Sequence, residues 1–251
     1  MKKILLFVLT LVFTSTAFGQ IAYLQYRKVP ADQEAKFVER ETKYWSKVAK
    51  SAIDKGQLAG WSLWKKVGVT KTDAPNYVFV NSYVSLDQLD QNFWGDNMDA
   101  LGDVKPQDVE TMSFTEVPFD YFVQFEDNIA GDYKYAIVNY GLPTSVGDFI
   151  QENKTLWKPF HENNIKNGNR MTAWGMASVV YPSGNQNRFS VFTYDGFNKL
   201  SDALDYLRYQ DYSSDGEAGP FADIISKSKM NELLPDGFNY RIIYERIMSV
   251  E

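Results

Sequence analysis

The chain has 251 residues, a formal net charge of −6, no cysteine and a single histidine, His161. The absence of cysteine excludes disulfides, thiolate metal sites and cysteine nucleophiles, and one histidine cannot build a multi-histidine zinc or copper site. An acidic chain without a basic stripe repels phosphate backbones, so we expect neither nucleic acid nor an anionic membrane surface as a partner.

Residues 1–19 have the pattern of a secretory signal peptide. Two lysines precede an apolar run over residues 4–13, which is too short to span a bilayer, and Ala17 and Gly19 occupy the positions that a signal peptidase reads. We therefore expect cleavage before Gln20, a mature net charge of −8 and a periplasmic or secreted location. No later stretch of the sequence is apolar for long enough to predict a transmembrane helix.

The first half of the mature chain reads as strand, helix, strand, strand, helix, strand. The sequence predicts strands over 22–29, 59–67, 77–84 and 121–126. A long helix follows Pro30 with its apolar residues at helical spacing, and Gly56 stands where a left-handed cap would end it. A shorter and more polar helical region precedes the last strand.

The second half repeats this order. Its predicted strands cover 133–142, 171–181, 188–195 and 240–245, and a second long helix follows Pro143. The two helices align at an offset of 112 residues through Phe37 with Phe149, Trp45 with Trp157, Ile53 with Ile165 and Gly56 with Gly168. We divide the mature chain into repeats over 20–127 and 133–251, joined by a short linker.

The expected fold class is therefore α+β, with two tandem ferredoxin-like β-α-β-β-α-β repeats. A four-stranded sheet with both helices on one face leaves its other face bare, and strands of this composition would expose a large apolar patch there. We expect the two bare faces to pack sheet to sheet as an intrachain pseudo-dimer, an α+β barrel with an interior between the repeats. The sequence leaves further homo-oligomerisation open.

Four shared features resemble the dimeric α+β barrel superfamily, which includes antibiotic-biosynthesis monooxygenases and the NIPSNAP-like and EthD-like proteins. These features are the long first helix, its glycine cap, the tryptophan-bearing strand that follows and a tyrosine on the third strand. The residues that carry the resemblance are Tyr44-Trp45 and Leu156-Trp157, Leu58 to Trp61, Met171 to Trp174, Tyr83 and Tyr194. The resemblance covers nearly the whole mature chain and implies a fold, while several activities remain open.

Aromatic residues that recur in both repeats are the candidate ligand-binding groups, because aromatic side chains on inner strands commonly line apolar cavities. The candidates are Trp61, Tyr83, Trp157, Trp174 and Tyr194, to which we add His161 of the second repeat. Core packing preserved from a duplication is the competing interpretation for the paired aromatics. His161 lies one helical turn after Trp157 and aligns with Ala49, so this position is specific to the second repeat.

These residues favour an exported barrel protein that binds a small apolar or aromatic ligand between the repeats. One alternative is a cofactor-independent monooxygenase-like enzyme, which requires polar groups that converge in a closed pocket. Another is haem binding through His161, as the resemblance implies for some barrels, which requires that histidine to face a porphyrin-sized cavity. The sequence itself predicts no cofactor and no metal site, selects no catalytic residues and contains no phosphate-binding loop or nucleophile elbow.

Overall fold

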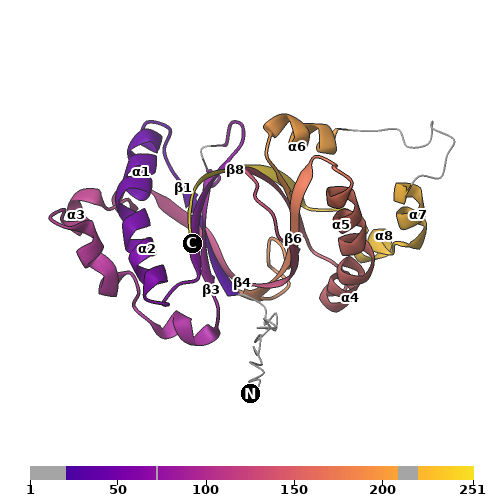
Figure 1. The fold of residues 1–251 in the computed structure, drawn as a ribbon, viewed down its shortest axis with the longest axis horizontal. Coiled ribbons are helices and arrows are strands. Elements are labelled where there is room, and N and C mark those ends of the chain that lie inside the picture. Colours follow the sequence, from indigo (N-terminus) through magenta and orange to yellow (C-terminus); the bar gives the residue numbers. More distant parts are fainter. Residues whose placement is uncertain (1–20, 72, 209–219) are drawn as a thin grey trace, which may run out of the picture.

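A computed structural model describes residues 21–71, 73–208 and 220–251, so the predicted signal peptide lies outside the described residues. Eight antiparallel strands close into one barrel in the order β1-β3-β2-β8-β5-β7-β6-β4, and β4 pairs with β1 to complete it. Figure 1 shows helices of the first half on one flank and those of the second half on the opposite flank. The strands are β1 (Ile21–Lys28), β2 (Gly60–Lys66), β3 (Tyr77–Tyr83), β4 (Glu116–Ile129), β5 (Tyr135–Gly141), β6 (Met171–Tyr181), β7 (Val191–Phe197) and β8 (Tyr240–Val250).

The first helix of each half is long and contains one π-helical turn. The first is α1 (Glu34–Arg40), the turn η1 (Glu41–Trp45) and α2 (Ser46–Asp54), and the second is α4 (Val146–Glu152), the turn η5 (Asn153–Trp157) and α5 (Lys158–Lys166). The two π turns begin 112 positions apart, which is also the offset of the aligned helices. Gly56 and Gly168 follow with φ angles of 70° and 79°, so the predicted left-handed caps are confirmed.

The second helical region of each half is broken into short pieces. These pieces are η2 (Leu86–Asp90), η3 (Gly95–Leu101), α3 (Pro106–Val109) and η4 (Met112–Phe114) in the first half, and α6 (Leu200–Leu207), α7 (Pro220–Lys227) and α8 (Met230–Leu233) in the second. Within the described residues, no helix is both long and apolar enough to cross a membrane.

The two halves join edge to edge, which differs from two separate sheets stacked face to face. β2 pairs with β8 and β4 pairs with β6, so each half satisfies the backbone edges that the other leaves open. This closure explains why β4 and β8 run further than the predicted strands. Pro118 is accommodated in β4 because β6 pairs only from Phe122 onward, which leaves one side of the early part of β4 free.

Alternate residues of each strand point into the barrel or toward the helices. On β1, Leu24 and Tyr26 belong to the interior cluster. On β3, Phe79 and Tyr83 pack outward with Phe37 of α1 in a second cluster. A third cluster lies under the helices of the second half. A smaller fourth cluster joins Val48 of α2 to Leu101 and Val109. The described residues therefore form one interior core and two main outer cores.

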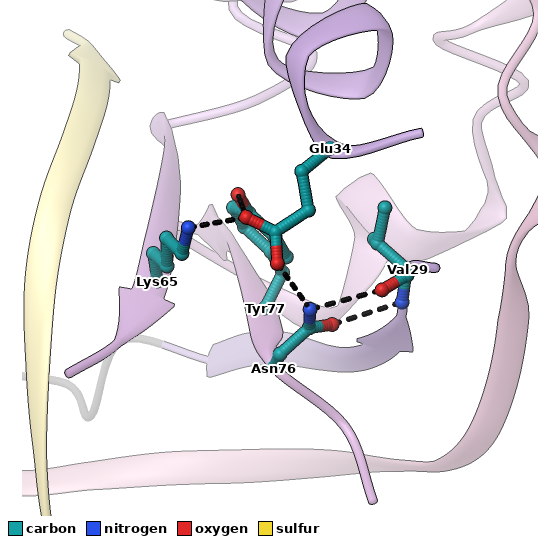
Figure 2. Close-up of polar contacts among 5 residues, drawn as sticks. All are labelled: Val29, Glu34, Lys65, Asn76 and Tyr77. Carbon is teal, nitrogen blue, oxygen red and sulfur yellow. Dashed lines mark hydrogen bonds and ion pairs between the residues drawn. The ribbon is translucent and has the colours of Figure 1, made fainter. Parts of the chain in front are cut away.

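A polar cluster near the start of α1 ties three strands to that helix (Figure 2). The Asn76 side chain exchanges two hydrogen bonds with the Val29 backbone, at 2.8 and 3.0 Å, and donates a third to Glu34 Oε1 at 3.0 Å. Glu34 also accepts from the Tyr77 hydroxyl at 3.3 Å and pairs with Lys65. Asn76 therefore fixes the end of β1 against the beginning of β3.

Asn76→Ala should lower the free energy of unfolding by about 2–3 kcal/mol, because it removes three hydrogen bonds and strands a backbone amide and carbonyl. Asn187 lies 111 residues later, directly before the predicted third strand of the second half, and donates one side-chain bond, to the Pro182 carbonyl at 2.8 Å. Asn187→Ala is the matched control and should cost about 1 kcal/mol. Urea denaturation followed by circular dichroism measures both, and equal losses would argue against the role assigned to Asn76.

Candidate functional site

The barrel encloses a cavity of about 890 Å³. Its walls are built by the inward-facing residues of the strands, and such a volume is within the range of small-molecule pockets. Aliphatic wall residues are Leu24, Val78, Val80, Ala136 and Val138, and aromatic ones are Trp64, Phe125 and Phe192. The lining therefore combines apolar side chains with polar ones, among them Ser62, Ser82 and Arg246.

Aromatic rings plug one end of the barrel. Phe189 packs against Tyr121 and Tyr140, with ring centroids 4.4 and 4.7 Å apart, and Phe119 lies 4.6 Å from Tyr26. At the other end, small residues such as Gly60 border the cavity. The cavity is therefore a cup with an aromatic floor.

Three tyrosine hydroxyls meet on this floor. Tyr140 donates to Tyr244 at 3.3 Å, and the hydroxyls of Tyr26 and Tyr140 are 3.0 Å apart. Burial raises the pKa of Tyr244 to about 12 and holds the pKa values of Tyr26 and Tyr140 well above their usual range. All three phenols are consequently neutral at physiological pH, and they come from strands of both halves.

A stack of rings forms one wall of the cup. Tyr133 lies between Trp64 and Tyr194, with centroid distances of 5.6 and 5.7 Å. Glycines make room for it, because a Cβ at Gly175 would overlap the Tyr194 ring and a Cβ at Gly196 would overlap the Tyr133 ring. The three rings therefore pack on one another and border the cavity together.

Arg246 lies beside this wall on β8, two residues after Tyr244. Its guanidinium donates to Asp132 at 2.6 Å and lies 5.9 Å from the centroid of the Trp64 ring. Asp127, another acid that borders the cavity, is paired with Lys158 at 2.7 Å. Asp132 and Asp127 are therefore each paired with a cation.

The structure separates the six sequence-predicted site residues. Tyr194 faces the cavity. Trp61 also borders the cavity, but its indole packs outward against Phe79. Tyr83 packs outward on Phe93. The remaining three gather under the helices of the second half and are Trp157, His161 and Trp174.

His161 is enclosed by aromatic rings. Its imidazole stacks between Trp157 and Trp174 at centroid distances of 6.2 and 5.6 Å, and Phe160 contacts its edge. Burial lowers the pKa of His161 to about 4, and its Nδ1 has no hydrogen-bond partner among the described residues. Because two indoles cover both faces of the ring and His161 lies outside the barrel cavity, these residues do not fit a porphyrin.

Sequence reasoning missed most of the groups that line the cup. Tyr26, Tyr140 and Tyr244 are separated by about a hundred residues each, and nothing local marks them as neighbours. In the described part of the chain, no group of three or more histidine and acidic side chains is arranged to hold a metal ion. The sequence does place a tyrosine near the end of the first strand of each half, Tyr26 in β1 and Tyr140 in β5.

No protein-family model matches the sequence, and no curated protein matches it. Among solved structures, the chain is similar to a monooxygenase-like protein from Lactobacillus acidophilus NCFM, with a TM-score of 0.52 and 6% identity over 92% of this chain and 96% of that one. An anthrone oxidase-like protein has a TM-score of 0.53 and 10% identity, over 92% of each chain. A mutant chlorite dismutase from Candidatus Nitrospira defluvii has a TM-score of 0.50 and 10% identity, over 91% of each chain.

These similarities show the dimeric α+β barrel fold. At such low identity they assign no activity to this chain. The predicted barrel fold is thereby supported, and membership of the superfamily and the likeness to NIPSNAP-like and EthD-like proteins stay predictions.

Proposed function

We propose that this chain is an exported barrel protein that binds a small apolar or aromatic molecule inside the barrel. The observation that carries the proposal is the 890 Å³ cup, whose wall combines aliphatic residues and a stack of aromatic rings with polar groups. Export rests on the signal-peptide pattern of residues 1–19.

Binding is favoured over the monooxygenase-like alternative by the chemistry of the floor. Proton abstraction needs a base with a pKa near the working pH, whereas burial raises the pKa values of the three floor phenols and makes them hydrogen-bond donors. The bordering acids Asp127 and Asp132 are held in ion pairs. The cup is therefore better suited to holding a ligand than to acid–base catalysis.

Binding of N-phenyl-1-naphthylamine, a neutral dye that fluoresces in apolar surroundings, tests this function. The wild-type protein should bind it saturably, and Val138→Trp, which fills the cup from β5, should weaken binding at least roughly tenfold. Val69→Trp is the matched control, because Val69 is 97% exposed. Both variants are first checked for a native circular dichroism spectrum.

A wild-type protein that fails to bind the dye would overturn the proposal. So would a folded Val138→Trp protein with wild-type affinity, since the dye would then be bound elsewhere.

We also infer that the halves are tandem ferredoxin-like repeats over 20–127 and 133–251. Their strand orders correspond, as β4-β1-β3-β2 and β8-β5-β7-β6. The matching π turns and glycine caps support the same inference. A cup whose floor takes Tyr26 from one repeat and Tyr140 from the other is a consequence of this arrangement.

A further inference from the structure

A tyrosine from the segment that joins β4 to β5 fills part of the cup. Tyr133 belongs to no strand, yet its ring lines the cavity and stacks between Trp64 of β2 and Tyr194 of β7, with interplanar angles of 24° and 28°. Gly196 makes room for this ring, because a Cβ there would come within 2.7 Å of it. The slot between the indole and the phenol therefore fits an aromatic ring, and the chain's own ring occupies it.

Hydrogen bonds on both sides of Tyr133 hold its ring in this slot. The Asp132 carbonyl accepts from the Thr172 hydroxyl at 2.8 Å, and the Asp132 carboxylate accepts from the Arg246 guanidinium at 2.6 Å. On the other side, the Lys134 amide donates to the last carbonyl of β7 at 3.0 Å, and the Lys134 carbonyl accepts from the Arg246 amide at 2.8 Å. A ligand that displaced the ring would have to break several of these bonds.

Above the floor, two aliphatic walls remain open to a ligand. Leu24, Val78 and Val80 line the cavity from β1 and β3, and Ala136 and Val138 line it from β5. β1 and β5 are four strands apart in either direction around the closed barrel, so these walls face each other. Val80 and Val138 are only partly buried, which leaves their methyl groups accessible from the cavity.

Two other rings of the wall do not provide a second slot. Phe125 and Phe192, which also line the cavity, are set edge to face with an angle of 88° between their planes, so they form no parallel pair around a third ring. An alkyl chain needs no such pair, because dispersion and the release of water from methylene groups have no preferred direction. The free part of the cup therefore suits an aliphatic group better than an aromatic one.

We propose that the cup selects aliphatic over aromatic apolar molecules, and that Tyr133 determines this selectivity because it occupies the ring slot itself. The alkyl part of the ligand lies between the wall of β1 and β3 and the wall of β5. This inference rests on the proposed ligand-binding function and narrows its ligand class.

Two alcohols that differ only at one end test the selectivity. 1-Octanol ends in a propyl group where 5-phenyl-1-pentanol ends in a phenyl group, and the two molecules are similar in length and hydrophobicity. Displacement of N-phenyl-1-naphthylamine gives both affinities. The wild-type protein should bind 1-octanol at least roughly threefold more tightly, because a rigid ring fits less well between the aliphatic walls than a flexible propyl end.

Tyr133→Ala vacates the slot and leaves Trp64 and Tyr194 in place, so a phenyl ring can stack where the tyrosine did. The ratio of the two affinities should shift by roughly tenfold in favour of 5-phenyl-1-pentanol, the effect of two stacked contacts. If this variant does not fold, as judged by circular dichroism, Tyr133→Leu takes its place because it retains more apolar packing.

Phe125→Ala is the matched control for the vacated slot. It also removes one ring from the wall of the cup, but it opens no gap between parallel rings. Its ratio of affinities should stay within about twofold of the wild-type ratio.

A wild-type protein that binds the dye but prefers 5-phenyl-1-pentanol, or binds both alcohols equally, would overturn the selectivity and leave the proposed function standing. An unchanged ratio in the folded Tyr133 variant would overturn the role of Tyr133. Failure of the dye and of both alcohols to bind would overturn the proposed function itself.

Discussion

Trp174→Ala should lower the free energy of unfolding by about 3–5 kcal/mol and leave the affinity for N-phenyl-1-naphthylamine unchanged. The indole is 1% exposed, stacks on His161 and packs between β6 and α5, so its removal leaves a large void that the neighbouring elements cannot close. Because this core lies outside the barrel, the void should not alter the cup. Urea denaturation measures the first quantity, and dye titration of the folded variant measures the second.

Trp157→Ala is the matched control for this experiment. Trp157 covers the other face of His161 but is only partly buried, so its loss should cost about 1–2 kcal/mol. A folded Trp174→Ala protein that no longer binds the dye would restore Trp174 to the ligand site, as the sequence had predicted. A stability loss below about 1 kcal/mol would mean that the second outer core is not packed as described.

The fold was largely predictable because its signals are local. Helical spacing of apolar residues, glycine caps and runs of β-branched and aromatic residues each depend on a few neighbouring positions. They placed both long helices and all eight strands in order. Edge pairing between β2 and β8, and between β4 and β6, joins residues far apart in the sequence, and no local pattern determines it.

The candidate site was less predictable because both faces of every strand are buried. Alternation of polar and apolar residues, which normally marks the inner face, is then lost. The sequence alignment paired Tyr83 with Tyr194 at an offset of 111. In the structure the counterpart of Tyr83 is Phe197, because Tyr83 lies opposite Ile21 and Phe197 lies opposite Tyr135. Tyr194 is three residues from that counterpart, and a slip by an odd number of residues reverses the face of a strand, so Tyr83 packs outward and Tyr194 faces the cavity. The floor tyrosines meet only through the closed barrel.

The first long helix contains a buried acid whose ionisation should make the stability of the protein depend on pH. Glu41 begins the π turn η1, is 5% exposed and accepts a hydrogen bond from the Thr111 hydroxyl at 2.6 Å. Burial raises the pKa of Glu41 to about 7, although Thr111 and the charge of Arg27 act in the opposite direction. Arg27 does not compensate the carboxylate fully, because its guanidinium donates to Thr115 at 2.9 Å.

Because this pKa is higher in the folded protein than in the unfolded chain, folding favours the protonated acid. The wild-type protein should therefore lose stability as pH rises from about 4.5 through 7, by up to ~3 kcal/mol. Glu41→Gln is neutral at every pH and should escape this loss. Its advantage over the wild type should be small at pH 5 and about 2–3 kcal/mol at pH 8, measured by urea denaturation at both values.

The comparison isolates Glu41 from other titrating groups. Asp195, whose pKa burial raises to about 6, titrates in both proteins and cancels in the difference. Glu39→Gln, on the exposed side of the same helix, should shift stability by a similar small amount at both pH values. Parallel pH profiles for wild type and Glu41→Gln would show that the carboxylate is solvated in the folded protein.

The second half already has an amide at the position that corresponds to Glu41. Asn153 begins the π turn of that half and donates to the Phe149 carbonyl at 2.9 Å, so a neutral side chain fits a π turn of this kind.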